Sequence, residues 1–77
     1  MKIEYDRKAD ALYIQLKEAY VHDNIDIEEG ISVDIDENGH VIGIEILDVT
    51  HRIPAEELAR LTFEHFPMGV SSMAKAK

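Results

Sequence analysis

Residues 31–49 read ISVDIDENGHVIGIEILDV, and this stretch decides the fold class. Its first five residues alternate apolar and polar side chains, which is typical of a half-buried β-strand. Asn38 and Gly39 then supply residues that tolerate positive backbone φ angles, as a tight hairpin turn requires. The alternation resumes from Val41 to Val49, so the stretch predicts two antiparallel strands joined by a turn.

The returning strand of this hairpin is apolar on both faces. Ile42, Ile44 and Ile46 are expected on one face. A strand of this kind is typically central in its sheet, covered on both sides, or pressed against another subunit. The opposite face is expected to carry Val41, Gly43, Glu45, Leu47 and Val49.

The N-terminal part of the chain predicts the remaining strands. Residues 2–5 and 12–17 both alternate apolar and polar side chains, and the polar residues 6–10 between them form a turn signal. This pattern predicts a second hairpin. A short third strand is expected over residues 25–28, ended by Gly30. Together the patterns predict a small, mainly antiparallel sheet of four or five strands.

The C-terminal part predicts a single helix over residues 54–66. Pro54 suits the first turn of a helix, where its missing amide hydrogen would have no partner, and Pro67 ends the apolar arc. We expect this helix to pack on one face of the sheet. The fold class is therefore α+β, with one domain over residues 1–66 and a flexible tail over residues 67–77.

Composition narrows the class of protein. The 77 residues include no cysteine, which excludes disulfides and thiolate metal sites. The net charge is −8, and no Lys or Arg occurs between Glu18 and His51, so binding to nucleic acid is not expected. No apolar run is long enough to cross a membrane, and we expect a cytoplasmic protein.

Two blocks of sequence carry a resemblance to a known family. The first is Tyr5-Asp6 with the run from Ala9 to Ile14. The second is Gly30-Ile31 with the run from Val33 to Asp36, Gly39, and the run from Gly43 to Leu47. In these blocks the chain resembles the small prokaryotic family called domain of unknown function 2283. The resemblance implies a compact protein with no established activity and no catalytic residues to assign. Some members lie near toxin-like genes, which implies an antitoxin-like partner role.

The hairpin turn also matches a calcium-loop pattern. Asp34, Asp36, Asn38, Gly39 and Glu45 fit the spacing D-x-[DN]-x-[DN]-G-x₅-E. A true calcium loop lies between helices, whereas these residues have the period of strands, so an ordinary acidic turn is the expected structure. Weak cation binding by Asp34, Asp36 and Asn38 is the alternative, and no other metal site or cofactor is expected.

Two functions remain open from the sequence. The first is an interaction module that forms a homodimer or binds a protein partner through an exposed sheet face. The second is an acidic small-ligand or divalent-cation-binding protein that uses residues 34–39. An enzyme is not expected, because nucleophile, phosphate-loop and dinucleotide motifs are absent. The expected interaction face consists of Tyr13, Val41, Gly43, Glu45, Leu47 and Val49.

Overall fold

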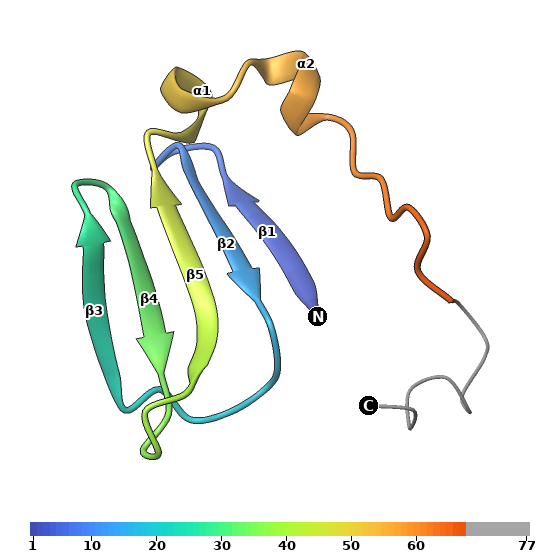
Figure 1. The fold of residues 1–77 in the computed structure, drawn as a ribbon. Helices are drawn as coiled ribbons and strands as arrows, with labels where there is room; N and C mark the ends of the chain where they lie inside the picture. The colour runs from blue at the N-terminus through green and yellow to red at the C-terminus, as the bar shows by residue number, and fades with distance from the viewer. Residues whose placement is uncertain (68–77) are drawn as a thin grey trace.

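The computed structural model describes residues 1–67, and these form one five-stranded antiparallel sheet followed by two short helices. The sheet order is β1-β2-β5-β4-β3, with β5 at the centre (Figure 1). This position confirms the expectation drawn from a strand that is apolar on both faces. The strands are β1 (Lys2–Asp6), β2 (Ala11–Gln15), β3 (Asp23–Glu28), β4 (Ile31–Ile35) and β5 (Val41–Leu47).

Aspartate side chains close the two tight turns that the sequence predicts. Asp6 Oδ1 accepts hydrogen bonds from the backbone amides of Lys8 at 3.0 Å and Ala9 at 3.3 Å. In the β4–β5 turn, Asp36 Oδ1 accepts from the amides of Asn38 and His40, both at 2.9 Å. An aspartate can stabilise a turn in this way because its short side chain reaches amides two to four residues ahead.

The connection from β2 to β3 sets the topology. Residues 16–22 carry the chain from β2 past the ends of β5 and β4 to the far edge of the sheet (Figure 1). The amide of Leu16 donates to the Ile42 carbonyl at 2.8 Å, and the amide of His22 donates to the Ile35 carbonyl at 2.8 Å. The β1–β2 hairpin therefore pairs with the free edge of the meander β3-β4-β5.

A β-bulge interrupts the pairing of β4 with β5. Asp34 pairs with Gly43, whereas the next residue, Ile35, pairs with Val41. Ile42 is the extra residue on β5, and its side chain is buried. Because a bulge changes the register by one residue, Val41 lies on the face of the sheet opposite to that of Gly43.

The strand predicted over residues 41–49 ends early. Asp48 has a left-handed backbone conformation, with φ at 51°, which stops the extended chain after Leu47. Val49 begins the short helix α1 (Val49–Arg52), and its amide donates to the Asp10 carbonyl at 3.0 Å. The sequence did not predict this helix, since the apolar alternation runs through Val49 without a break.

The single helix predicted over residues 54–66 is wrong in length. Within residues 54–66 the structure has a helix only at α2 (Ala55–Leu58). The remaining residues of the predicted range, 59–66, include Thr62, Phe63, His65 and Phe66, whose side chains favour helix only weakly. An amphipathic helix also depends on packing against a surface, and α1 and α2 lie beyond one end of the sheet (Figure 1). They do not cover either face.

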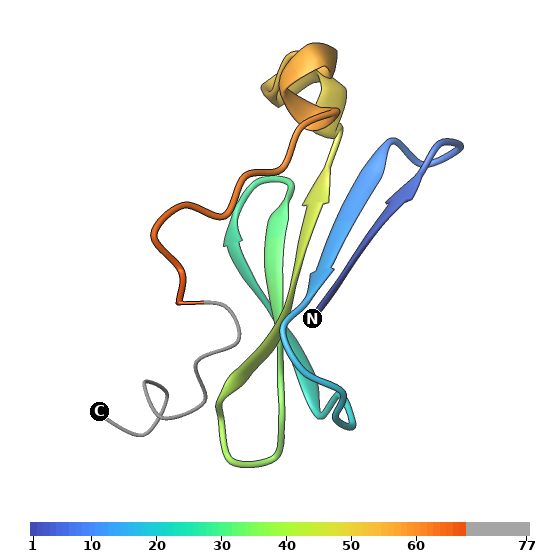
Figure 2. The ribbon, with the colours of Figure 1, turned by 90° about the vertical axis from the view of Figure 1, so that its right-hand side faces the viewer.

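Few side chains are fully buried. Among residues 1–67, the buried apolar side chains are Ile42 and Val49. Figure 2 shows why, because the twisted sheet forms a single layer in this part of the chain. The predicted tail lies almost entirely outside the described residues. Within residues 1–67, no helix is long and apolar enough to span a membrane.

Candidate functional site

The strand register divides the side chains of the sheet into two unlike faces. Cross-strand partners point to the same face, so the pairs Ile3–Ile14, Leu12–Ile46 and Val33–Ile44 share one side. We call this side the apolar face. Its apolar members are Ile3, Tyr5, Leu12, Ile14, Ile25, Ile31, Val33, Ile35, Val41, Ile44 and Ile46.

The apolar face is only partly shielded from solvent by the rest of the described chain. Ile3, Tyr5 and Ile25 keep 41%, 46% and 44% of their surface exposed. The side chains between them are half-buried by their strand neighbours. A contiguous apolar surface of this extent is typical of an interface rather than of solvent-facing structure.

The opposite side is called the polar face. It consists of Lys2, Glu4, Asp6, Ala11, Tyr13, Gln15, Asn24, Asp26, Ser32, Asp34, Gly43, Glu45 and Leu47. Four of the expected interaction residues, Tyr13, Gly43, Glu45 and Leu47, are brought together here. The other two are not, because Val41 lies beyond the bulge and Val49 is buried in α1.

A hydrogen-bonded network connects three strands across the polar face. The hydroxyl of Tyr13 donates to Asp34 Oδ2 at 2.7 Å. Asn24 Nδ2 donates to the other oxygen of Asp34 at 2.8 Å and to Ser32 Oγ at 3.1 Å. The hydrogen bond to Asp34, followed by partial burial, raises the pKa of Tyr13 to about 12. The sequence does not indicate a role for Asn24, because Asn24 meets Asp34 only through the pairing of β3 with β4.

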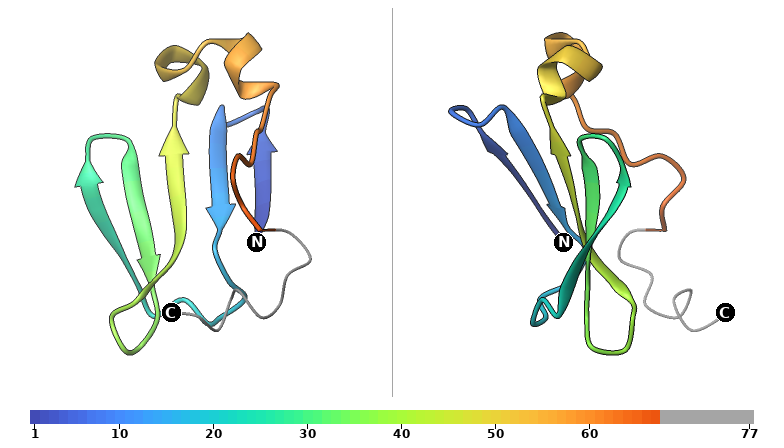
Figure 3. Two further views of the ribbon diagram at one scale, coloured as in Figure 1. Left: turned by 45° about the vertical axis from the view of Figure 1, so that its right-hand side comes forward. Right: turned by 90° about the vertical axis from the view of Figure 1, so that its left-hand side faces the viewer.

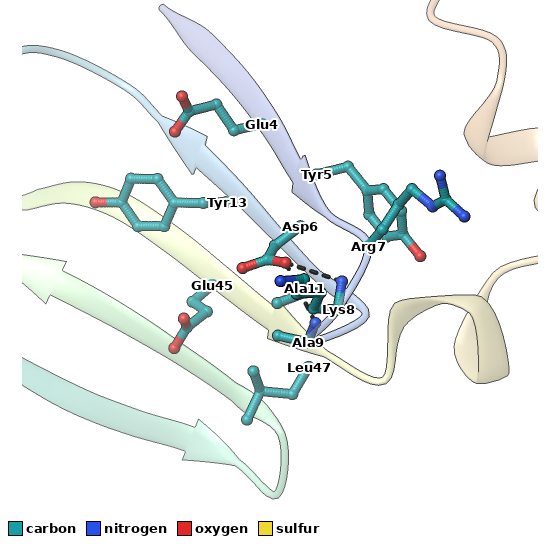
Figure 4. Close-up of a pocket in the computed structure, with 10 residues that line it drawn as sticks. All are labelled: Glu4, Tyr5, Asp6, Arg7, Lys8, Ala9, Ala11, Tyr13, Glu45 and Leu47. Atoms are coloured by element: carbon teal, nitrogen blue, oxygen red, sulfur yellow. Dashed lines mark hydrogen bonds between the residues drawn. The ribbon is translucent and has the colours of Figure 1, made fainter.

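A wide, open hollow of about 820 Å³ lies beside this network (Figure 4). The side chain of Tyr13 and the carboxylates of Glu4, Asp6 and Glu45 border it in the close-up. Arg7 and Lys8 also line it. Because the hollow offers both signs of charge, its lining does not define one ligand chemistry.

The residues of the calcium-loop pattern have separate partners. Asp34 is engaged by Tyr13 and Asn24 on the polar face. Asp36 accepts from the amides of its own turn, which lowers the pKa of its carboxyl group. Glu45 lies further along β5, opposite Tyr13. These hydrogen bonds give Asp34 and Asp36 structural roles, Asp34 between strands and Asp36 within its turn.

A different group of potential metal ligands lies where β2 begins and α1 starts. One ligand atom each from Asp10, Asp48 and His51 lie within 4.8 Å of one another. The Asp10 carboxylate also accepts hydrogen bonds from the Thr50 hydroxyl at 2.7 Å and the Tyr5 hydroxyl at 2.9 Å. The Thr50 hydrogen bond is the largest of several influences that lower the pKa of Asp10.

This second group could supply two carboxylates and one imidazole to a divalent cation. The hydrogen bonds from Thr50 and Tyr5 also give Asp10 a structural role, since they connect α1 to the β1–β2 hairpin. No sequence pattern indicates this group, because Asp10 and Asp48 are 38 positions apart and meet only through the pairing of β2 with β5.

These features define a small α+β protein with one exposed apolar sheet face. The family model described as "Protein of unknown function (DUF2283)" matches residues 2–49, which include all five strands. The chain therefore belongs to this family, as the resemblance in the sequence indicated. No curated protein and no solved structure matches the chain.

Proposed function

We propose that this protein is a self-associating interaction module, in which the apolar face of one copy packs against the same face of a second copy. The observation that carries the proposal is the exposure of this face in residues 1–67, where Ile3, Tyr5 and Ile25 remain more than 40% exposed. Two such sheets facing one another at about 10 Å would form a β-sandwich with an apolar core.

The small number of buried apolar side chains supports this arrangement. Full burial of one large apolar side chain contributes roughly 1.5–3 kcal/mol, and only Ile42 and Val49 are buried among residues 1–67. Ordering each residue costs on the order of 1–2 kcal/mol in backbone entropy. The chain contains no cysteine to supply a disulfide. A second layer of protein over the apolar face would supply the missing burial.

Residues 68–77 offer little apolar material for such a layer. Residues 68–77 read MGVSSMAKAK and include only three apolar side chains larger than alanine. The apolar face has eleven large apolar side chains. A second copy brings an equal set, so it matches the face in both size and polarity.

The dimensions of the sheet are adequate for a modest dimer. Five strands at about 4.8 Å spacing and five residues at about 3.4 Å give a flat area of about 400 Å². Side-chain relief increases the accessible surface above this value, toward the ~800 Å² per partner that stable interfaces bury. Two charged residues of the edge strand β3 lie at the border of the face, Asp23 opposite Ile35 and Glu28 opposite Ile31.

The test compares two substitutions with equal starting exposure on opposite faces. Ile3 on the apolar face and Leu47 on the polar face are both 41% exposed. Molar mass is measured by light scattering over a concentration series for the wild type, Ile3→Glu and Leu47→Glu. Circular dichroism of each variant reports whether the sheet is retained.

We expect a dimer that Ile3→Glu weakens and Leu47→Glu leaves intact. A central variant, Ile14→Ser, should weaken the dimer further without introducing a charge. If Leu47→Glu alone dissociated the dimer, the polar face would be the interface and the proposal would be wrong. A folded wild-type monomer at all concentrations would also overturn it, and a different protein would then be needed to cover the face.

A further inference from the structure

An apolar pocket of about 350 Å³ lies where α2 meets the end of the apolar face. Tyr5 and Leu12 contribute to it from β1 and β2, and Leu58 contributes from α2. Ala55 and Ala59 leave room because their side chains are small. The remaining lining residue is Thr50. The pocket is large enough for an aromatic ring, and it is continuous with the apolar face through Tyr5 and Leu12.

The chain that leaves this pocket carries large apolar side chains that the fold does not bury. We call residues 59–67 the arm. Leu61, Phe63 and Phe66 on the arm are 70%, 60% and 58% exposed. The rings of Phe63 and Phe66 lie against each other, with centroids 5.8 Å apart. Exposed aromatic side chains of this kind are the usual anchors of protein interfaces.

The arm extends away from its own pocket. Figures 2 and 3 show it leaving α2 and descending on one side of the sheet, separated from the strands. This is the side on which α2 approaches Tyr5 and Leu12, and it is therefore the side of the apolar face. An arm in this position would lie between the two sheets of the dimer or at their border.

We propose that in the dimer each arm crosses to the other copy and inserts an aromatic side chain, Phe63 or Phe66, into the pocket beneath α2 of that copy. The inference rests on the proposed self-association and names the segment that completes the interface. Two-fold symmetry makes the exchange reciprocal, so two arms fill two pockets and the assembly closes at two subunits.

The length of the arm is sufficient for this exchange. Facing sheets lie about 10 Å apart. An extended chain covers at most about 3.3–3.6 Å per residue, so Phe63 lies up to ~14 Å from Ala59, and Phe66 up to ~25 Å. Either ring can therefore reach the facing copy. Arg60, Leu61 and Thr62 include neither Gly nor Pro to favour a tight turn back toward the arm's own pocket.

The absence of cysteine makes disulfide trapping a clean test of which chain fills the pocket. One full-length chain carries Ala55→Cys in the pocket. A second chain, distinguishable by a mass tag, carries Glu64→Cys beside Phe63. The two are unfolded, mixed, refolded together and oxidised. We expect a disulfide that joins the unlike chains, detected by mass spectrometry.

The matched control replaces Ala55→Cys with Asn38→Cys, which lies in the β4–β5 turn at the opposite end of the sheet (Figure 1). This pair should give little crosslinking. A third chain carries both Ala55→Cys and Glu64→Cys. If this chain forms its disulfide internally while the mixed pair does not crosslink, each arm fills its own pocket and the exchange is wrong.

A second measurement tests the aromatic anchors without crosslinking. Phe63→Ala and Phe66→Ala are compared with Tyr20→Ala, which removes an aromatic ring that is 85% exposed in the β2–β3 connection. We expect at least one of the two arm variants to weaken the dimer by about tenfold, and the control to leave it unchanged. If neither arm variant weakens the dimer and the mixed chains do not crosslink, the exchange is wrong but self-association stands. If no dimer forms at all, both proposals are wrong.

Discussion

The hydroxyl of Tyr13 occupies the space where a side chain at Gly43 would begin. A β-carbon built on Gly43 would overlap the hydroxyl oxygen of Tyr13. Because Gly43 has no side chain, the tyrosine can cross β5 and donate its 2.7 Å hydrogen bond to Asp34 on β4. One glycine thus permits a bond between two strands that are not neighbours in the sheet.

Gly43→Ala should therefore destabilise the protein by about 1–3 kcal/mol, because the new methyl group forces the tyrosine ring or the strand to move. The measurement is urea unfolding at fixed protein concentration. In a Tyr13→Ala background the same substitution should be neutral or stabilising, since alanine is favoured over glycine in a strand by roughly 0.5–1 kcal/mol. An equal cost in both backgrounds would show that Tyr13 is not the obstacle.

Tyr13 should ionise well above an ordinary tyrosine. Its pKa is raised from 10.0 to about 12, mainly by the hydrogen bond to Asp34. A raised folded-state pKa contributes stability that is fully present below pH 10 and is lost as the pH rises toward 12. An alkaline titration followed by tyrosinate absorbance should show a late phase that disappears in Tyr13→Phe. Asp34→Asn should move this phase toward 10, and a late phase that is unchanged in Asp34→Asn would exclude the hydrogen bond as its cause.

Thr50→Val should lower the thermal midpoint by several degrees at neutral pH, because it removes the hydroxyl that donates to Asp10 at 2.7 Å. The pKa of Asp10 is lowered below 3.8, so its contribution to stability is present above pH 3.8 and is lost as the pH falls through the folded-state value. The difference in midpoint between variant and wild type should therefore shrink below pH 3.8. Thr50→Ser retains the hydroxyl and serves as the control; a loss of equal size in this variant would assign the effect to packing instead.

The strands were predictable because their signal is local. Alternation over residues 31–35 and 41–47, with Asn38 and Gly39 between them, requires only neighbouring residues to specify a hairpin. The family resemblance also came from short blocks, and the family match over residues 2–49 confirms it. The same local rule failed at Val49, because the conformation of Asp48 depends on the attachment of α1 to Asp10.

The prediction of one helix over residues 54–66 was wrong for a related reason. Its apolar arc was visible in the sequence, but a helix of this composition is stabilised mainly by the surface it packs against. In the described structure the large apolar side chains of the arm remain exposed. Of the predicted range, only Ala55–Leu58 is helical.

In the candidate site, too, some features follow from the local sequence and others depend on tertiary contacts. The sequence by itself determined the strand faces except at the bulge, where Val41 lies on the face opposite to the expected one. It placed Tyr13, Gly43, Glu45 and Leu47 on one face, and the pairing of β2 with β5 brings them together. Only the tertiary structure decided that Asn24 reaches Asp34, that Asp10 meets Thr50, and that the apolar face remains exposed. The physical reason is that side-chain periodicity is fixed over a few residues, whereas contacts between distant segments depend on strand order and on what covers each face.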